Sequence, residues 1–134
     1  MLKKTITYTD YNGDERTEDF YFNISRGEML DMQLSTPGGY DTKIQQVLDS
    51  RDYVSMYAIF KDLVNRSYGI KSDDGKRFIK SEKLLEEFKQ TEAYSNLFME
   101  FVQSPDFADT FVNGVFPKGA VSDVAKADAL PASE

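Results

Sequence analysis

Two short runs of alternating residues, separated by a turn signal, place the strongest constraint on the fold of this 134-residue chain. Side chains of a β-strand alternate between its two faces, so each run has one apolar face. The apolar members of the two runs are Ile6, Tyr8, Phe20, Phe22 and Ile24. The intervening sequence, Asp10-Tyr-Asn-Gly-Asp14, is typical of a tight turn. We therefore predict that the chain begins with a β-hairpin.

The shared apolar face also constrains the length of the turn. A two-residue turn at Asn12-Gly13 would place Ile6 opposite Asp19, so an apolar face would lie beside a polar one. Because a shift of one residue moves every side chain to the other face, an odd loop or a bulge is needed. We predict a three-residue loop, Tyr11-Asn12-Gly13, with Gly13 as the left-handed residue of a G1 bulge.

Short helices are predicted after the hairpin. Ser25 and Glu28 have the spacing of a capping box, and Ile24 and Met29 that of a hydrophobic staple. Apolar periodicity predicts helices at about 26–34, 41–50 and 53–68, with Gly69 as a C-cap. A loop or a tight turn around Asp73-Asp74-Gly75 is expected at 70–80. Three more helices are expected after N-caps at Ser81, Thr91 and Ser104.

The predicted fold class is α+β and mostly α, with a hairpin followed by about six short helices. Residues 1–117 are expected to form a single globular domain, a β-hairpin plus a helical bundle. Residues 118–134 are mostly small or polar, so we predict a flexible tail. The residues expected in the core include Phe60, Leu63, Phe98, Phe101, Phe107 and Phe111.

Composition excludes several functional classes. The chain has no cysteine and no histidine, so disulfides, thiolate metal sites and the usual general base are excluded. The formal net charge of −7 argues against nucleic-acid binding, which needs clustered Lys and Arg. No apolar run is long enough to span a bilayer, and the N-terminus lacks the apolar core of a signal peptide. We expect a cytosolic protein with no membrane partner.

The polar clusters of the chain favour structural interpretations. The Asp73-Asp74-Gly75 sequence lacks the spacing of a calcium loop and is interpreted as a polar turn. A nearby basic cluster, with Lys80 among its members, is expected to be solvated and paired locally with Asp73, Asp74 and Glu82. Adjacent carboxylates such as Glu86-Glu87 are not placed in an apolar pocket by the pattern. We therefore predict a protein that is not an enzyme and needs no cofactor.

Interaction with other proteins is the function that the composition favours. Flexible Met and aromatic side chains suit adaptable binding of apolar helices, although most of them are expected in the core. Two strands alone leave both edges unpaired, so a partner or a second copy is expected to cover them. The candidate partner-binding residues are Thr5, Thr7, Tyr21, Met32 and Met99.

Four segments of the chain resemble the small tail assembly chaperones of long-tailed bacteriophages and prophages of Gram-positive bacteria. They are 4–13 (KTITYTDYNG), 17–23 (TEDFYFN), 68–81 (YGIKSDDGKRFIKS) and 91–100 (TEAYSNLFME). The resemblance covers about residues 3–117. It implies a non-catalytic protein of the host cytoplasm that coats the tape measure protein before the tail tube assembles and is absent from the mature virion. It also implies a longer frameshifted form that recruits the tail tube protein.

Two alternatives remain open at this stage. One is an acidic phage-encoded inhibitor of a host nucleic-acid-binding protein. The other is a minor structural component of the tail. A homo-oligomer is also expected, because pairing of strand edges between copies is one way to cover them.

Overall fold

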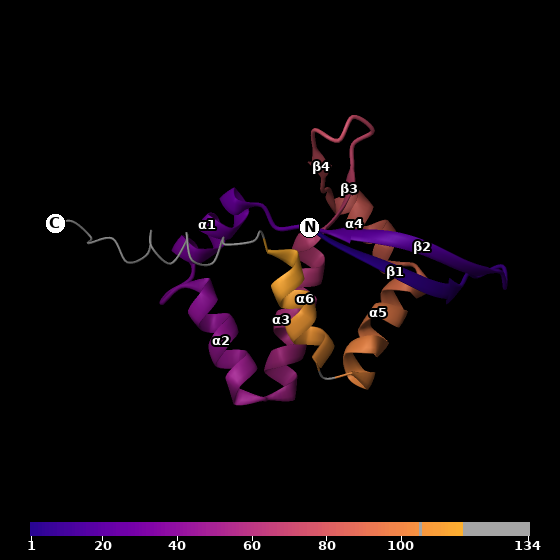
Figure 1. Ribbon diagram of the computed structural model, residues 1–134. Coiled ribbons are helices and arrows are strands. Elements are labelled where there is room, and N and C mark those ends of the chain that lie inside the picture. The colour runs from indigo at the N-terminus through magenta and orange to yellow at the C-terminus, as the bar shows by residue number, and fades with distance from the viewer. Residues whose placement is uncertain (105, 117–134) are drawn as a thin grey trace.

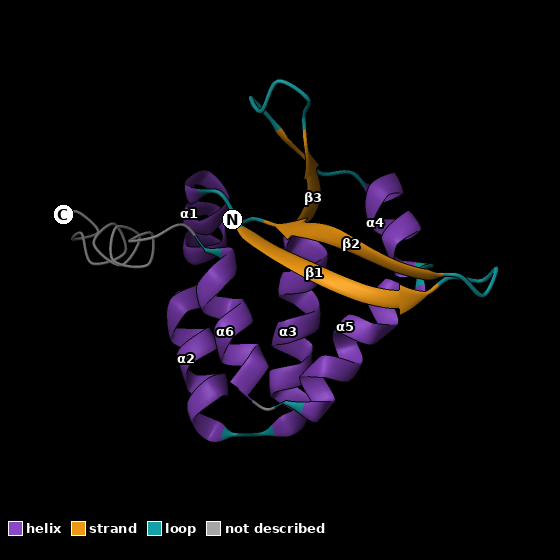
Figure 2. Cartoon of the chain, turned by 45° about the vertical axis from the view of Figure 1, so that its right-hand side comes forward, coloured by secondary structure: helices purple, strands orange, loops and turns teal. Residues whose placement is uncertain are grey.

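The computed structural model describes residues 1–104 and 106–116 (Figures 1 and 2). The elements, in chain order, are β1 (Leu2–Thr9), β2 (Glu15–Phe22), α1 (Arg26–Ser35), α2 (Tyr40–Ser50), α3 (Tyr53–Ser67), β3 (Tyr68–Lys71), β4 (Phe78–Ile79), α4 (Glu82–Lys89), α5 (Glu92–Gln103) and α6 (Asp106–Val115). The predicted α+β, mostly α fold with an N-terminal hairpin and six helices is confirmed. The predicted tail at 118–134 lies outside the described residues, so the division at residue 117 stays a prediction.

The predicted register of the first hairpin is confirmed. Ile6 pairs with Glu18 and Thr9 with Glu15, and Asp10 N donates to Asp14 O at 2.8 Å, which leaves three loop residues. Gly13 has a φ of +87°, the left-handed conformation that the G1 bulge requires.

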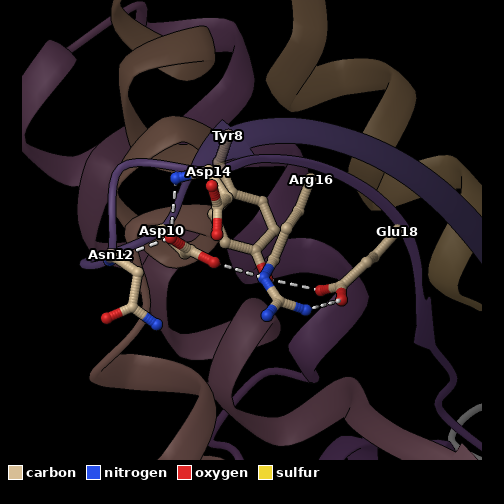
Figure 3. A network of polar contacts seen from close by, with 6 residues as sticks. All are labelled: Tyr8, Asp10, Asn12, Asp14, Arg16 and Glu18. Carbon is tan, nitrogen blue, oxygen red and sulfur yellow. Dashed lines mark hydrogen bonds and ion pairs between the residues drawn. The ribbon is translucent and has the colours of Figure 1, made fainter.

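Side chains at the tip hold the turn closed. Figure 3 shows the Asp10 carboxylate accepting hydrogen bonds from Asn12 N, Asp14 N and Arg16 Nε, at 2.9, 3.0 and 2.6 Å. The Arg16 guanidinium and the two backbone N–H groups lower the pKa of Asp10. The tip is thus fixed by local polar contacts rather than by burial.

The sheet is larger than the sequence predicted. The four strands lie in the order β1-β2-β3-β4, and β3 pairs with the end of β2 through Tyr21–Gly69. The turn predicted around Asp73-Asp74-Gly75 is present, but strands β3 and β4, which flank it and make a second hairpin, were not predicted. Gly69 is a strand residue and not a helix C-cap: a Cβ there would lie 2.6 Å from Ile79 O. A glycine is therefore needed at this position because β3 and β4 approach closely, and not because the backbone has a positive φ.

The predicted caps of several helices are confirmed. Ser25 and Glu28 form the reciprocal capping box of α1, and Ser81 and Thr91 cap α4 and α5 through their hydroxyls. At the start of α2, the buried Gln33 supplies the acceptor for Asp41 N at 2.9 Å. Pro105, predicted as the first residue of the last helix, lies outside the described residues.

The core lies between the hairpin and the helices. Figure 2 shows α3, α5 and α6 on one side of β1 and β2. Ile6 and Phe22 are buried against them, as the parity of the strands predicts. Of the six predicted core residues, Phe60, Leu63, Phe101 and Phe111 are buried. Phe98 and Phe107 are only partly buried, because both lie where the helical layer meets solvent.

Candidate functional site

The outer edge of β1 is the first candidate surface. In an antiparallel pair, hydrogen-bonded and non-hydrogen-bonded positions alternate. Because Asp10 N bonds to Asp14 O, the backbone groups of the even residues of β1 point toward β2, and those of Thr5 and Thr7 point away from it. The Asn96 amide confirms this direction by donating to Thr7 O at 3.1 Å. The backbone N–H groups of Thr5 and Thr7 therefore lie on the unpaired edge.

A groove runs between this edge and α5. It has a volume of about 290 Å³ and is lined by residues 4–7 and by α5 residues that include Asn96, Met99 and Gln103; we call it the edge groove. The Lys4 ammonium closes one part of the groove by an ion pair with Glu100 at 2.7 Å. The structure thus brings together three of the candidate partner-binding residues, Thr5, Thr7 and Met99.

The other two candidate residues lie elsewhere. Tyr21 is partly buried on β2, where Lys71 Nζ lies 4.7 Å from its ring centroid. Met32 is only 6% exposed and belongs to the core, because α1 packs with that side inward. Burial of the side chain shows that Met32 packs in the core, and its role in binding a partner stays a prediction.

A second candidate surface lies on the opposite flank of α5. A cleft of about 360 Å³ is formed there by three helices, and we call it the aromatic cleft. Its lining residues are Tyr57 and Lys61 of α3, Lys89 of α4, and Tyr94, Ser95 and Phe98 of α5. The rings of Tyr57, Tyr94 and Phe98 form the floor of the cleft, and the side chains of Lys61 and Lys89 lie beside it.

The aromatic floor is held rigidly. The Tyr94 and Phe98 rings stack with centroids 4.6 Å apart, and Tyr57 meets Phe98 edge-on at 5.8 Å. The Tyr94 hydroxyl donates to Asn65 Oδ1 at 2.9 Å, and burial raises the pKa of this phenol. The phenol therefore stays neutral, and the floor keeps its shape over the ordinary pH range.

Exposed apolar side chains are also present on α3 and α5, two of the three helices that form this cleft. They are Tyr53, Val54 and Tyr57 on α3 and Met99 and Val102 on α5, and we call these five residues the α3–α5 surface. Val54 is 75% exposed and Val102 is 52% exposed. The Tyr53 ring lies 5.4 Å from the buried Phe101 ring, which ties the two helices together at this end. Exposed apolar residues on two helices that pack together make this a candidate protein-binding surface.

The polar clusters singled out in the sequence have structural roles. The Asp74 carboxylate accepts from Ser72 Oγ at 2.7 Å and from Lys76 N at 3.0 Å, which fits the interpretation of 73–75 as a turn. Lys80 was expected to pair locally, but its Nζ instead binds Glu28 at 2.7 Å and joins β4 to α1. Within residues 1–104 and 106–116, no group of three or more acidic side chains is arranged to hold a metal ion.

The aromatic cleft was missed by reasoning from the sequence. Lys61, Lys89 and Ser95 come from three different helices, and only the packing of those helices brings them together. The sequence offered one signal, which is that Tyr57 makes the apolar stripe of its helix wider than burial against the core requires.

A family model described as phage tail assembly chaperone matches residues 1–134, and the chain belongs to this family. No curated protein and no solved structure matches the chain. The helices of the described residues are all too short or too polar to cross a membrane.

Proposed function

We propose that this phage tail assembly chaperone binds the tape measure protein and keeps it soluble until the tail tube assembles around it. The proposal is supported by the exposed apolar residues of the α3–α5 surface, together with membership of this family. A long helical partner exposes apolar stripes before the tube covers them, and an apolar surface between two helices can mask such a stripe. The net charge of −7 would then keep the coated complex soluble.

The proposal extends to the other components of assembly. Many copies bound weakly along one long chain would gain avidity, so each contact can remain reversible. The tail tube protein is the proposed second partner, recruited through a longer frameshifted form. The proposed role is non-catalytic. It belongs to the host cytoplasm, because the chaperone leaves as the tube closes and is absent from the mature virion.

Self-association through the edge of β1 is a further part of the proposal. An antiparallel second copy would place Thr5 opposite Thr7 of the other copy, and threonine pairs are favourable across strands. The same sheet already contains such a pair, Thr7 and Thr17, with hydroxyl oxygens 2.9 Å apart. Lys3 is the sole charged side chain among the odd residues of β1, so pairing brings no like charges face to face. The Asn96 amide must release Thr7 O for the strands to meet.

Co-expression with the tape measure protein tests the proposal. We expect affinity purification of the chaperone to retain a soluble tape measure protein, and finished virions to lack the chaperone by mass spectrometry. The paired substitution Val54→Asp and Val102→Asp should abolish retention, because it puts two charges into the α3–α5 surface. Leu30→Asp with Leu34→Asp is the matched control, since both leucines are exposed on α1 and the added charge is the same. A tape measure protein that does not co-purify with the wild-type chain would contradict the proposal, and recovery of the chain in virions would instead favour a structural component.

A further inference from the structure

The two lysines of the aromatic cleft distinguish it from the rest of the protein. The chain is acidic, yet both charged residues that line this cleft are cations, Lys61 on α3 and Lys89 on α4. Neither forms an ion pair within residues 1–104 and 106–116, although six other ion pairs do form there. The carboxylate next to Lys61 in sequence, Asp62, is instead engaged by Tyr40 and Arg66 at 2.9 Å each. The cleft therefore presents unneutralised positive charge beside an apolar floor.

The cost of covering these lysines limits what can bind. An apolar segment that occupies the floor also removes water from the ammonium groups beside it, and an ammonium that loses water without gaining a partner is strongly unfavourable. A carboxylate on the occupant would replace that water with charge-assisted hydrogen bonds. Charge complementarity thus selects an occupant with acidic side chains next to its apolar ones.

The geometry of the surface favours a helical occupant. The α3–α5 surface and the cleft together extend along α3 from residue 53 to residue 61, a rise of about 12 Å, or roughly two helical turns. That length matches apolar anchors at positions i, i+4 and i+7 of a partner helix. Lys61 and Lys89 lie at one end of this stretch, so they would also fix the direction of the bound partner helix.

We propose that the aromatic cleft recognises a helix whose apolar stripe ends in Asp or Glu, and that Lys61 and Lys89 pair with those carboxylates and set the orientation of the bound helix. This inference rests on the proposed function, in which the partner is the tape measure protein. It adds a rule for which segments of that protein are coated: those with carboxylates at one end of an apolar stripe.

Charge reversal tests the inference on the full chain. The affinity of Lys61→Glu/Lys89→Glu for the co-expressed tape measure protein should fall by about tenfold or more. Wild-type binding should weaken as NaCl rises, and Lys61→Gln/Lys89→Gln should be much less sensitive to salt. Lys76→Glu/Lys83→Glu is the matched control, with the same change in net charge at exposed residues outside the cleft. Equal binding by the wild type and the cleft variant, or an equal loss in the control, would overturn the inference.

A second measurement separates this inference from the proposed function. Two designed amphipathic helical peptides, differing only in Glu or Lys at one end of the apolar stripe, are titrated against the wild-type chain by fluorescence anisotropy. We expect tighter binding of the Glu peptide, and loss of that preference in Lys61→Glu/Lys89→Glu. Equal binding of both peptides would overturn the inference. If the Glu preference holds while the tape measure protein does not bind, the proposed function fails and the chemistry of the cleft stands.

Discussion

The two flanks of α5 offer different kinds of binding surface. On one flank the edge groove presents backbone donors of β1, together with polar side chains and the neutralised pair Lys4–Glu100. On the other flank the aromatic cleft presents rings and two cations without ion-pair partners among the described residues. Backbone donors suit an extended strand, whereas a grooved apolar surface suits a helix. We propose that the edge groove serves a second copy and that the aromatic cleft serves the tape measure protein.

Removal of the buried ring that packs α5 against α3 should have the largest effect on stability. Phe101 is buried, and its ring lies 4.9 Å from that of Phe60 and holds α5 against α3. We expect Phe101→Ala to lower the free energy of unfolding by about 3–5 kcal/mol in urea titrations and to weaken both surfaces together. Met99→Ala, at a residue 51% exposed on the same helix, should change stability by less than about 1 kcal/mol. A small effect of Phe101→Ala would contradict this assignment of the buried side of α5.

Proline substitutions separate the edge groove from the sheet itself. The N–H of Thr5 points to the free edge, so Thr5→Pro should disrupt self-association while it costs little stability. The N–H of Ile6 points toward β2, so Ile6→Pro removes a ladder hydrogen bond as well as a buried side chain and should destabilise the fold far more than Thr5→Pro. Light scattering and thermal melts measure the two effects. A wild-type chain that remains monomeric at high concentration would defeat the self-association proposal.

Low pH should weaken the fold at the start of α1, which lies outside both binding surfaces. Burial raises the pKa of Glu28, but hydrogen bonds from Lys80 and Ser25 outweigh it and hold the pKa below its ordinary value of 4.5. A carboxyl with a lower pKa in the folded state stabilises the protein above the unfolded pKa, and that contribution is lost as pH falls through the folded value. Stability should therefore drop below about pH 4.5, and Glu28→Gln should flatten this part of the profile. Identical profiles for the two chains would refute the role of Glu28.

The smallest effect is expected at the end of the chain. Removal of residues 118–134 should leave the melting temperature nearly unchanged, because the segment is poor in apolar bulk. Calorimetry of the truncated chain measures this directly, and a loss of several degrees would show that the segment packs on the domain.

The two hairpins show how far the sequence predicts the fold. The first was predicted down to its loop length, because eight-residue strands carry enough alternation to fix the register. The second was missed, because strands of four and two residues carry no readable period and Gly69 follows a helix, where a C-cap is common. The aromatic cleft depends on packing between residues far apart in the sequence, and the Gln33 hydrogen bond at the start of α2 depends on how α1 packs beside α2. Local patterns do not encode them.

Site-specific cross-linking identifies the surface of the chaperone that contacts the tape measure protein. The chain has no cysteine, so a single introduced cysteine can carry a photoactivatable thiol reagent without background labelling. We expect Val54→Cys and Val102→Cys to cross-link to the co-expressed tape measure protein, and Leu34→Cys, at a position 60% exposed on α1, not to do so. Cross-links from Leu34→Cys alone, with none from the other two positions, would contradict the assignment of the α3–α5 surface as the binding site.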